Sequence, residues 1–248
     1  MTTAPGGAPA DGTAYGNPAD RRVTGPATRV RRTAGSVALA ALAAFALLTT
    51  VVAVRHGSPL PPDASLLSWA VGHRPGPAVA TARAVTSTGT DVAPYALAAL
   101  AGVVAGRTAR QRLLAAALAL LCLGAGQGLR RAVLYAVGRS RPPAADWATH
   151  ASDWSFPSGH ATTAALTTAL LVTAVLLRSP PGRRARLLAL AAPLVCWGVT
   201  VGLTRVYLGV HWFSDVVGGW LFATAWYATC VWAAARLLPA LPGRPATP

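Results

Sequence analysis

The sequence predicts an all-α fold, a bundle of six transmembrane helices, and its composition and its apolar runs both point to the membrane. Hydrophobic residues make up 53% of the 248 residues, and the mean hydropathy is +0.45. Charged residues make up only 12%, whereas soluble domains carry about 25%. The apolar residues fall into long runs that short polar segments separate. A chain of this length is sufficient for one compact membrane bundle.

Each predicted span is an apolar run close to the length that crosses a bilayer, about 20 residues. The runs are Ala34–Val54, Val92–Gly106, Leu113–Val133, Ala161–Leu177, Leu187–Leu203 and Val216–Leu238. Several of them look short because polar residues interrupt one end. Polar residues inside a membrane usually line a site or a cavity, so a functional site is expected at these ends.

The segments that flank this membrane domain, residues 33–238, have a different composition. Residues 1–32 are rich in Gly, Pro, Ala and Thr, which predicts a disordered N-terminal tail, and residues 239–248 form a short C-terminal tail. The run Ala34–Val54 is too long for a typical signal-peptide core, and no small-residue cleavage site follows it. We therefore expect an uncleaved first span.

Arginine supplies all 22 basic residues, and the formal net charge is +15. Nucleic-acid-binding domains gather such residues on one solvated face, whereas these arginines lie between apolar runs, so a nucleic-acid partner is not expected. They concentrate in alternate connections, at residues 21–32, 107–112, 178–186 and 236–244. The positive-inside rule makes that side cytoplasmic. The sequence thus predicts a plasma-membrane protein with both termini inside.

Other polar and reactive residues have simpler interpretations. The cysteines lie inside apolar runs, so neither a disulfide framework nor a zinc site is expected; they are Cys122, Cys196 and Cys230. Asp63 is a plausible N-cap for a short outer helix, Ala64–Val71, which would form a surface connector. His56 and His150 are treated as ordinary loop residues, and Asp146 and Asp153 as solvated or capping residues.

A histidine and an aspartate near the last span form the first candidate for chemistry. His211 and Asp215 are four residues apart, so on a helix they share one face. A carboxylate bonded to one ring nitrogen fixes the tautomer and leaves the other nitrogen free to attack. Arg205, which precedes them, offers a forked cation suited to phosphate oxygens. This cluster predicts a histidine nucleophile.

The segment Pro157–His160 forms a second cluster directly before a predicted span. Backbone N–H groups at a helix N-terminus bind anions readily. Gly159 allows the backbone to approach closely, and Ser158 adds a hydroxyl donor. His160 is placed to protonate a leaving oxygen. Together with Arg141, these residues are expected on the outer side of the membrane.

In these motifs the chain resembles the type-2 phosphatidic acid phosphatase superfamily, whose signature is K-x6-R-P, P-S-G-H and S-R-x5-H-x3-D. Arg141-Pro142 matches the end of the first motif, and Pro157–His160 matches the second in full. The third is matched at the correct spacing by Arg205, His211 and Asp215. The resemblance covers about residues 34–238 in the order of spans and motifs.

The resemblance implies a metal-independent lipid phosphatase that needs no cofactor and works through a phosphohistidine. In this scheme His211 attacks phosphorus, Asp215 orients it, and His160 protonates the leaving oxygen. The phosphate would be held by Arg141, Arg205, Ser158 and the Gly159 amide. Undecaprenyl pyrophosphate is the slightly favoured substrate, beside phosphatidic acid and phosphatidylglycerol phosphate. A phosphotransferase of the same fold and an inactive lipid-binding protein remain alternatives.

Two positions depart from the family pattern. Leu134 stands at the place of the family lysine and can donate nothing to phosphate. We expect Arg131, or failing that Arg130, to supply the cation from one helical turn earlier. Thr204 replaces the usual serine and keeps a hydroxyl. For Arg139, phosphate binding and contact with lipid headgroups are equally plausible roles.

Overall fold

The computed structural model describes residue 2, residues 25–180 and residues 182–237. Regular structure in these residues is helical throughout, which confirms the predicted all-α class. The elements are α1 (Pro26–Val54), α2 (Pro61–Gly72), α3 (Gly76–Ser87), α4 (Val92–Ala105), α5 (Ala109–Val137), a short 3₁₀ helix η2 (Ala144–Asp146), α6 (Gly159–Arg178), α7 (Arg184–Tyr207) and α8 (Phe213–Leu237).

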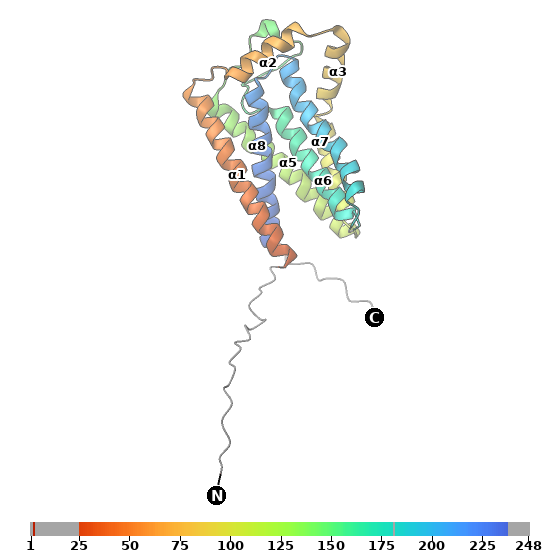
Figure 1. Cartoon of the computed structure of the whole chain (residues 1–248). Coiled ribbons are helices and arrows are strands. Elements are labelled where there is room, and N and C mark those ends of the chain that lie inside the picture. The colour runs from red at the N-terminus through yellow and green to blue at the C-terminus, as the bar shows by residue number, and fades with distance from the viewer. Residues whose placement is uncertain (1, 3–24, 181, 238–248) are drawn as a thin grey trace.

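The long helices run side by side, and α6 lies among them (Figure 1). Helix α6 contacts α4, α5, α7 and α8, while α1 packs mainly on α8. Small residues and threonines line the buried face of α6 and let its neighbours approach closely. The hydroxyls of Thr162 and Thr163 donate to the carbonyl oxygens of Ser158 and Gly159, both at 2.8 Å. Their polarity is therefore satisfied within the helix, as an apolar environment requires.

Among the described residues, five helices are long and apolar enough to cross a membrane: α1, α5, α6, α7 and α8. Helix α4 has 14 residues, fewer than the roughly 17 that a span needs. It meets that test only together with α3, from which it is bent by 50°. The run Val92–Gly106, expected to form a span by itself, is thus the second half of a bent pair.

Helix α1 begins at Pro26, earlier than the expected start at Ala34. Proline suits the first turn of a helix because its missing N–H has no partner there in any case. Arg29, Arg31 and Arg32 consequently lie on the helix, and the predicted tail boundary at residue 32 is too late. Most of the N-terminal tail and all of the C-terminal tail, residues 239–248, lie outside the described residues.

The connections that carry the candidate motifs share the end of the bundle at which α2 lies (Figure 1). Helix α5 ends at Gly138, whose left-handed φ of 59° turns the chain away from the helix. Helix α2 begins at Pro61 rather than after Asp63, which instead sits in its first turn and accepts a hydrogen bond from the Leu60 amide at 2.9 Å. The expected N-cap role of Asp63 is therefore wrong in position, although the residue still satisfies a backbone donor.

Candidate active site

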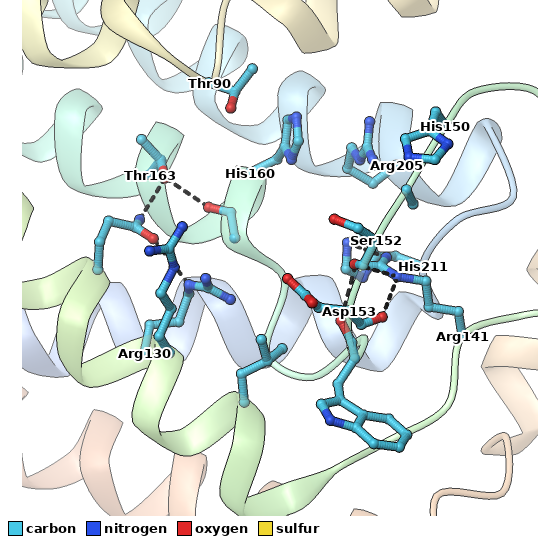
Figure 2. A pocket seen from close by; sticks show the side chains of 16 residues that line it. Thr90, Arg130, Arg141, His150, Ser152, Asp153, His160, Thr163, Arg205 and His211 are labelled. Carbon is cyan, nitrogen blue, oxygen red and sulfur yellow. Dashed lines mark hydrogen bonds between the residues drawn. The ribbon is translucent and has the colours of Figure 1, made fainter.

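A cavity of about 320 Å³ opens among α5, the loop at residues 150–154, α6 and α7. Most of the residues singled out in the sequence line it, and Figure 2 shows several of them projecting inward from different helices. They are Arg131, Arg141, Gly159, His160, Arg205 and His211. Asp215 and Ser158 are fully buried and lie behind this wall.

The ring of His211 is held between an arginine and an aspartate. Its Nδ1 lies 3.3 Å from Asp215 Oδ2, and its Nε2 lies 3.0 Å from Arg141 Nη1. A guanidinium only donates hydrogen bonds, so Nε2 accepts, and the ring proton belongs on Nδ1 facing Asp215. This tautomer, assigned from the contacts, turns the Nε2 lone pair toward the cavity.

Asp215 is fixed by more than the histidine. Its Oδ2 also accepts from the Trp212 amide at 2.9 Å, and its Oδ1 accepts from Arg139 Nη1 at 2.6 Å. His211 lies before α8, and Asp215 lies in the first turn of that helix. The two residues meet as predicted, but through a turn that Asp215 caps rather than across one helix face.

The pKa of His211 lies well below its ordinary value of 6.5, first because the ring is buried and then because Arg141, Arg205 and Arg130 are close. Both causes disfavour the imidazolium, in agreement with the neutral tautomer. Burial also lowers the pKa of Arg141, a loss that Asp215 and Asp153 partly oppose.

The Arg141 side chain is anchored by backbone carbonyl groups of the pocket wall. It donates to the carbonyl oxygens of Ser152 at 2.7 Å, Trp154 at 2.9 Å and Val210 at 2.7 Å. These contacts hold the guanidinium beside His211 without neutralising it. A phosphate oxygen placed there would meet a positioned donor.

Arg205 and Arg130 are buried cations that pair with no carboxylate in the described residues. All salt bridges in the described part of the chain involve Asp63, Arg139, Asp215 and His211. Arg205 makes only a long contact of 3.4 Å to Thr86 Oγ1, and its Nε has no hydrogen-bond partner. Buried charges are normally paired, so these guanidinium groups favour an anionic ligand.

The N-terminus of α6 adds backbone donors to the cavity. None of the hydrogen bonds among the described residues uses the amides of Gly159 or His160. The Ser158 hydroxyl instead caps the helix by accepting from the Ala161 amide at 3.5 Å. Because Ser158 does not line the cavity, the geometry gives little support to its predicted contact with phosphate.

A buried arginine lies close to the position of the family lysine. Leu134 is buried against the cavity, and Arg130 lies one turn earlier with its guanidinium beside Gly159. Arg130 donates to the Pro157 carbonyl oxygen at 3.2 Å and to Gln127 Oε1 at 3.0 Å. Arg131 also lines the cavity but is exposed. The contacts therefore favour Arg130, the second choice from sequence, over Arg131.

Sequence reasoning missed several residues. Arg139 is buried and paired with carboxylates, so neither phosphate binding nor headgroup contact describes it. His150 and Asp153, taken for ordinary loop residues, line the cavity. Gln127 also lines it and donates to Thr163 Oγ1 at 2.5 Å. A lone amide side chain inside an apolar run is the signal that could have identified Gln127.

Comparison with known proteins identifies the family of this chain. The PAP2 superfamily profile matches residues 115–238, which is half of the chain. Phosphatidylglycerophosphatase B of Bacillus subtilis (strain 168) is 34% identical over 103 residues, which span 41% of this chain and 49% of that protein.

A solved structure, the transmembrane PAP2 type phosphatidylglycerolphosphate phosphatase from Bacillus subtilis, superposes with a TM-score of 0.67. It covers 81% of this chain and 96% of that chain at 24% identity, which supports the fold. The described helices, the ordered motifs and the matching profile together show that this chain belongs to the PAP2 superfamily.

Proposed function

We propose that this protein is an integral membrane lipid phosphatase that uses His211 as its nucleophile. One observation carries the proposal: a single cavity unites the neutral His211 ring, backed by Asp215, with arginines that have no carboxylate partner in the described chain. Phosphoryl transfer depends mainly on positioning and on stabilising charge, and this cavity supplies both.

In the proposed reaction, Nε2 of His211 attacks phosphorus while the bond from phosphorus to the lipid oxygen breaks. The departing oxygen takes a proton from His160. Asp215 balances the positive charge that develops on the His211 ring, and Arg141, Arg205 and Arg130 hold the phosphoryl oxygens. Water then attacks phosphorus, the N–P bond breaks, and His160 accepts the proton of that water. Because guanidinium groups and backbone amides supply the stabilising charge, the reaction is proposed to need no metal ion.

The substrate is proposed to be a phosphate ester or pyrophosphate of a lipid, whose tail stays in the bilayer while the phosphate enters the cavity. The similarity to the Bacillus subtilis phosphatidylglycerophosphatase favours phosphatidylglycerol phosphate. Undecaprenyl pyrophosphate, which the resemblance to the family slightly favoured, is the second candidate. Both present a charged group that the arginines would bind.

Phosphate release by the purified protein in detergent tests this function. A panel of phosphatidylglycerol phosphate, phosphatidic acid and undecaprenyl pyrophosphate, with and without chelator, gives the substrate class and the metal requirement. Release should persist in chelator and disappear in His211→Ala. Transfer to an added alcohol in place of water would indicate a phosphotransferase, and binding without turnover would indicate a lipid-binding protein.

We further propose six spans, with α3 and α4 as one bent span, and an extracytoplasmic cavity. The support is the arginine-rich connections at the end of the bundle opposite the cavity. In a background with the native cysteines replaced by alanine, Ala145→Cys should react with an impermeant thiol reagent in intact cells. Pro180→Cys should react only after lysis. The reverse labelling would place the cavity in the cytoplasm.

A further inference from the structure

The structure contains a second group of charged side chains, behind the cavity, that the reaction scheme does not use. Arg139 is 1% exposed and Asp63 is 1% exposed, and neither lines the cavity. The two come from the loop after α5 and from the first turn of α2. Such burial is costly unless the charges are paired and hydrogen-bonded, so their contacts need an explanation.

Arg139 joins two carboxylates. Its Nη2 lies 2.9 Å from Asp63 Oδ2, and its Nη1 lies 2.6 Å from Asp215 Oδ1. Its Nε donates to the Gly57 carbonyl oxygen at 3.2 Å, so the guanidinium is fixed on three sides. Asp215 is the residue behind His211, and the chain of contacts therefore ends at the proposed nucleophile.

Asp63 also accepts hydrogen bonds from the start of α8. Its Oδ1 accepts from the Ser214 amide at 2.7 Å, and its Oδ2 accepts from Ser214 Oγ at 2.6 Å. The same Oγ accepts from Arg139 Nη1 at 2.7 Å. A carboxylate from α2 thus caps the helix that carries Asp215, across 151 residues of sequence.

The balance of charge gives this arrangement a chemical consequence. One positive charge on Arg139 meets two negative charges, so the three groups together carry one negative charge. If Asp63 were neutral, Arg139 would neutralise Asp215 completely and leave nothing to balance a cationic His211. With Asp63 ionised, one negative charge remains for the imidazolium that forms when His211 attacks.

We infer that Asp63 and Arg139 are positioning residues that hold Asp215 and keep its negative charge available to His211. This inference rests on the proposed function, since it assigns a role to groups behind the same nucleophile. The other charged or titratable groups that face His211 are Arg141, Arg205 from α7, Arg130 from α5 and His160 from α6. All of these lie on the cavity side, so Asp215 supplies the only carboxylate contact of the ring in the described structure.

The test compares Asp63→Asn with the double variant Asp63→Asn/Arg139→Gln. Asparagine keeps the size of Asp63 and an acceptor for Ser214 but removes the charge. We expect kcat to fall by about ten- to a hundredfold, by analogy with the partners that orient metal-binding histidines, with KM within about threefold of wild type. Loss of a negative charge also lowers the pKa of His211 further, so the acid limb of the kcat profile should move to lower pH.

The double variant removes one negative and one positive charge, which returns the net charge behind His211 to that of the wild type. The double variant takes away the cationic partner of Asp215, which keeps the hydrogen bond from the Trp212 amide at 2.9 Å, so the folding of both variants is checked by thermal unfolding. We expect the double variant to have at least several-fold higher kcat than Asp63→Asn and an acid limb near that of the wild type. A purely structural role predicts the opposite, a double variant whose kcat is no higher than that of Asp63→Asn.

Asp91→Asn and Arg55→Gln serve as matched controls, because both residues are exposed and lie outside the cavity. Wild-type kcat in Asp63→Asn, or a double variant as inactive as His211→Ala, would overturn the inference. Full activity of His211→Ala in the same assay would instead overturn the proposed function. The two failures are therefore distinguishable.

Discussion

Arg139 and Arg141 are two residues apart in the sequence, yet they occupy opposite electrostatic environments. Arg139 lies between two carboxylates and has no exposure to the cavity. Arg141 lines the cavity, is held by carbonyl oxygens and is paired with no carboxylate of the described chain. An arginine that is paired with carboxylates stabilises the fold, whereas an arginine without a carboxylate partner can bind an anionic ligand. Arg205 and Arg130 belong with Arg141 in this respect.

The largest effect is expected at His211, which contacts Arg141 directly and Arg139 through Asp215. His211→Ala removes the nucleophile while both sets of arginines remain, and kcat should fall by about four powers of ten or more, as for other nucleophilic residues. No acid-labile phosphoenzyme should be trapped in rapid quench with labelled lipid phosphate. His56→Asn is the control, because His56 is exposed and asparagine tolerates its positive φ of 50°. Near-native turnover in His211→Ala would exclude the histidine mechanism.

A contrast between stability and activity should separate the two kinds of arginine. Arg205→Ala removes a buried cation without a counter-ion, so kcat/KM should fall by about two to three powers of ten, from charge-assisted bonds of about 1.5–3 kcal/mol each. Its unfolding temperature in phosphate-free detergent should not fall, and stabilisation by added phosphate should be lost. Arg139→Ala leaves two buried carboxylates unpaired and should lower the free energy of unfolding by about 3–5 kcal/mol. Equal destabilisation by both changes, measured by thermal unfolding, would remove the distinction.

The substitute for the family lysine should have an intermediate effect. Arg130→Ala should lower kcat/KM by about one to two powers of ten, because one charge-assisted contact is lost. Arg131→Ala should have a smaller effect, since its side chain is exposed. Leu134→Lys should partly rescue Arg130→Ala by returning a cation to the same wall of the cavity. Steady-state kinetics decide the assignment, measured on Arg130→Ala, Arg131→Ala and the rescue variant. If both alanine variants behave as wild type, the site has one cation fewer than the family pattern.

The smallest effect concerns pH. Because burial and the cavity arginines lower the pKa of His211 below 6.5, the nucleophile stays neutral as the pH falls through the range where an ordinary histidine gains a proton. The acid limb of kcat/KM that belongs to His211 should therefore lie below pH 6.5, with a change of less than about twofold between pH 7.5 and 6.5. A limb centred near 6.5 would mean that the ring is solvated like a free histidine.

Sequence patterns predicted the parts of the molecule that depend on local chemistry. Spans such as α5 and α8 follow from apolar length, and the meeting of His211 with Asp215 follows from their spacing. The bent pair of α3 and α4 was missed because α3 is rich in Ala and Thr and carries no long apolar run. The pairing of Asp63 with Arg139 joins residues 76 positions apart. The spacing of residues along the sequence does not predict such a contact, which forms where α2 packs against α7 and α8.

In the proposed mechanism, the hydrogen bond between Arg141 and Nε2 of His211 would keep the nucleophile unreactive until a substrate binds. The donor that would hold the substrate occupies the lone pair that would attack it, so the two functions exclude each other until an anion draws the guanidinium aside. Electrophiles without negative charge would then find the Nε2 lone pair occupied, so His211 should resist alkylation and acylation when no anion is bound. Free phosphate, in contrast, would unmask the ring, so the protein should exchange oxygen between ¹⁸O-labelled phosphate and water even when no lipid is present.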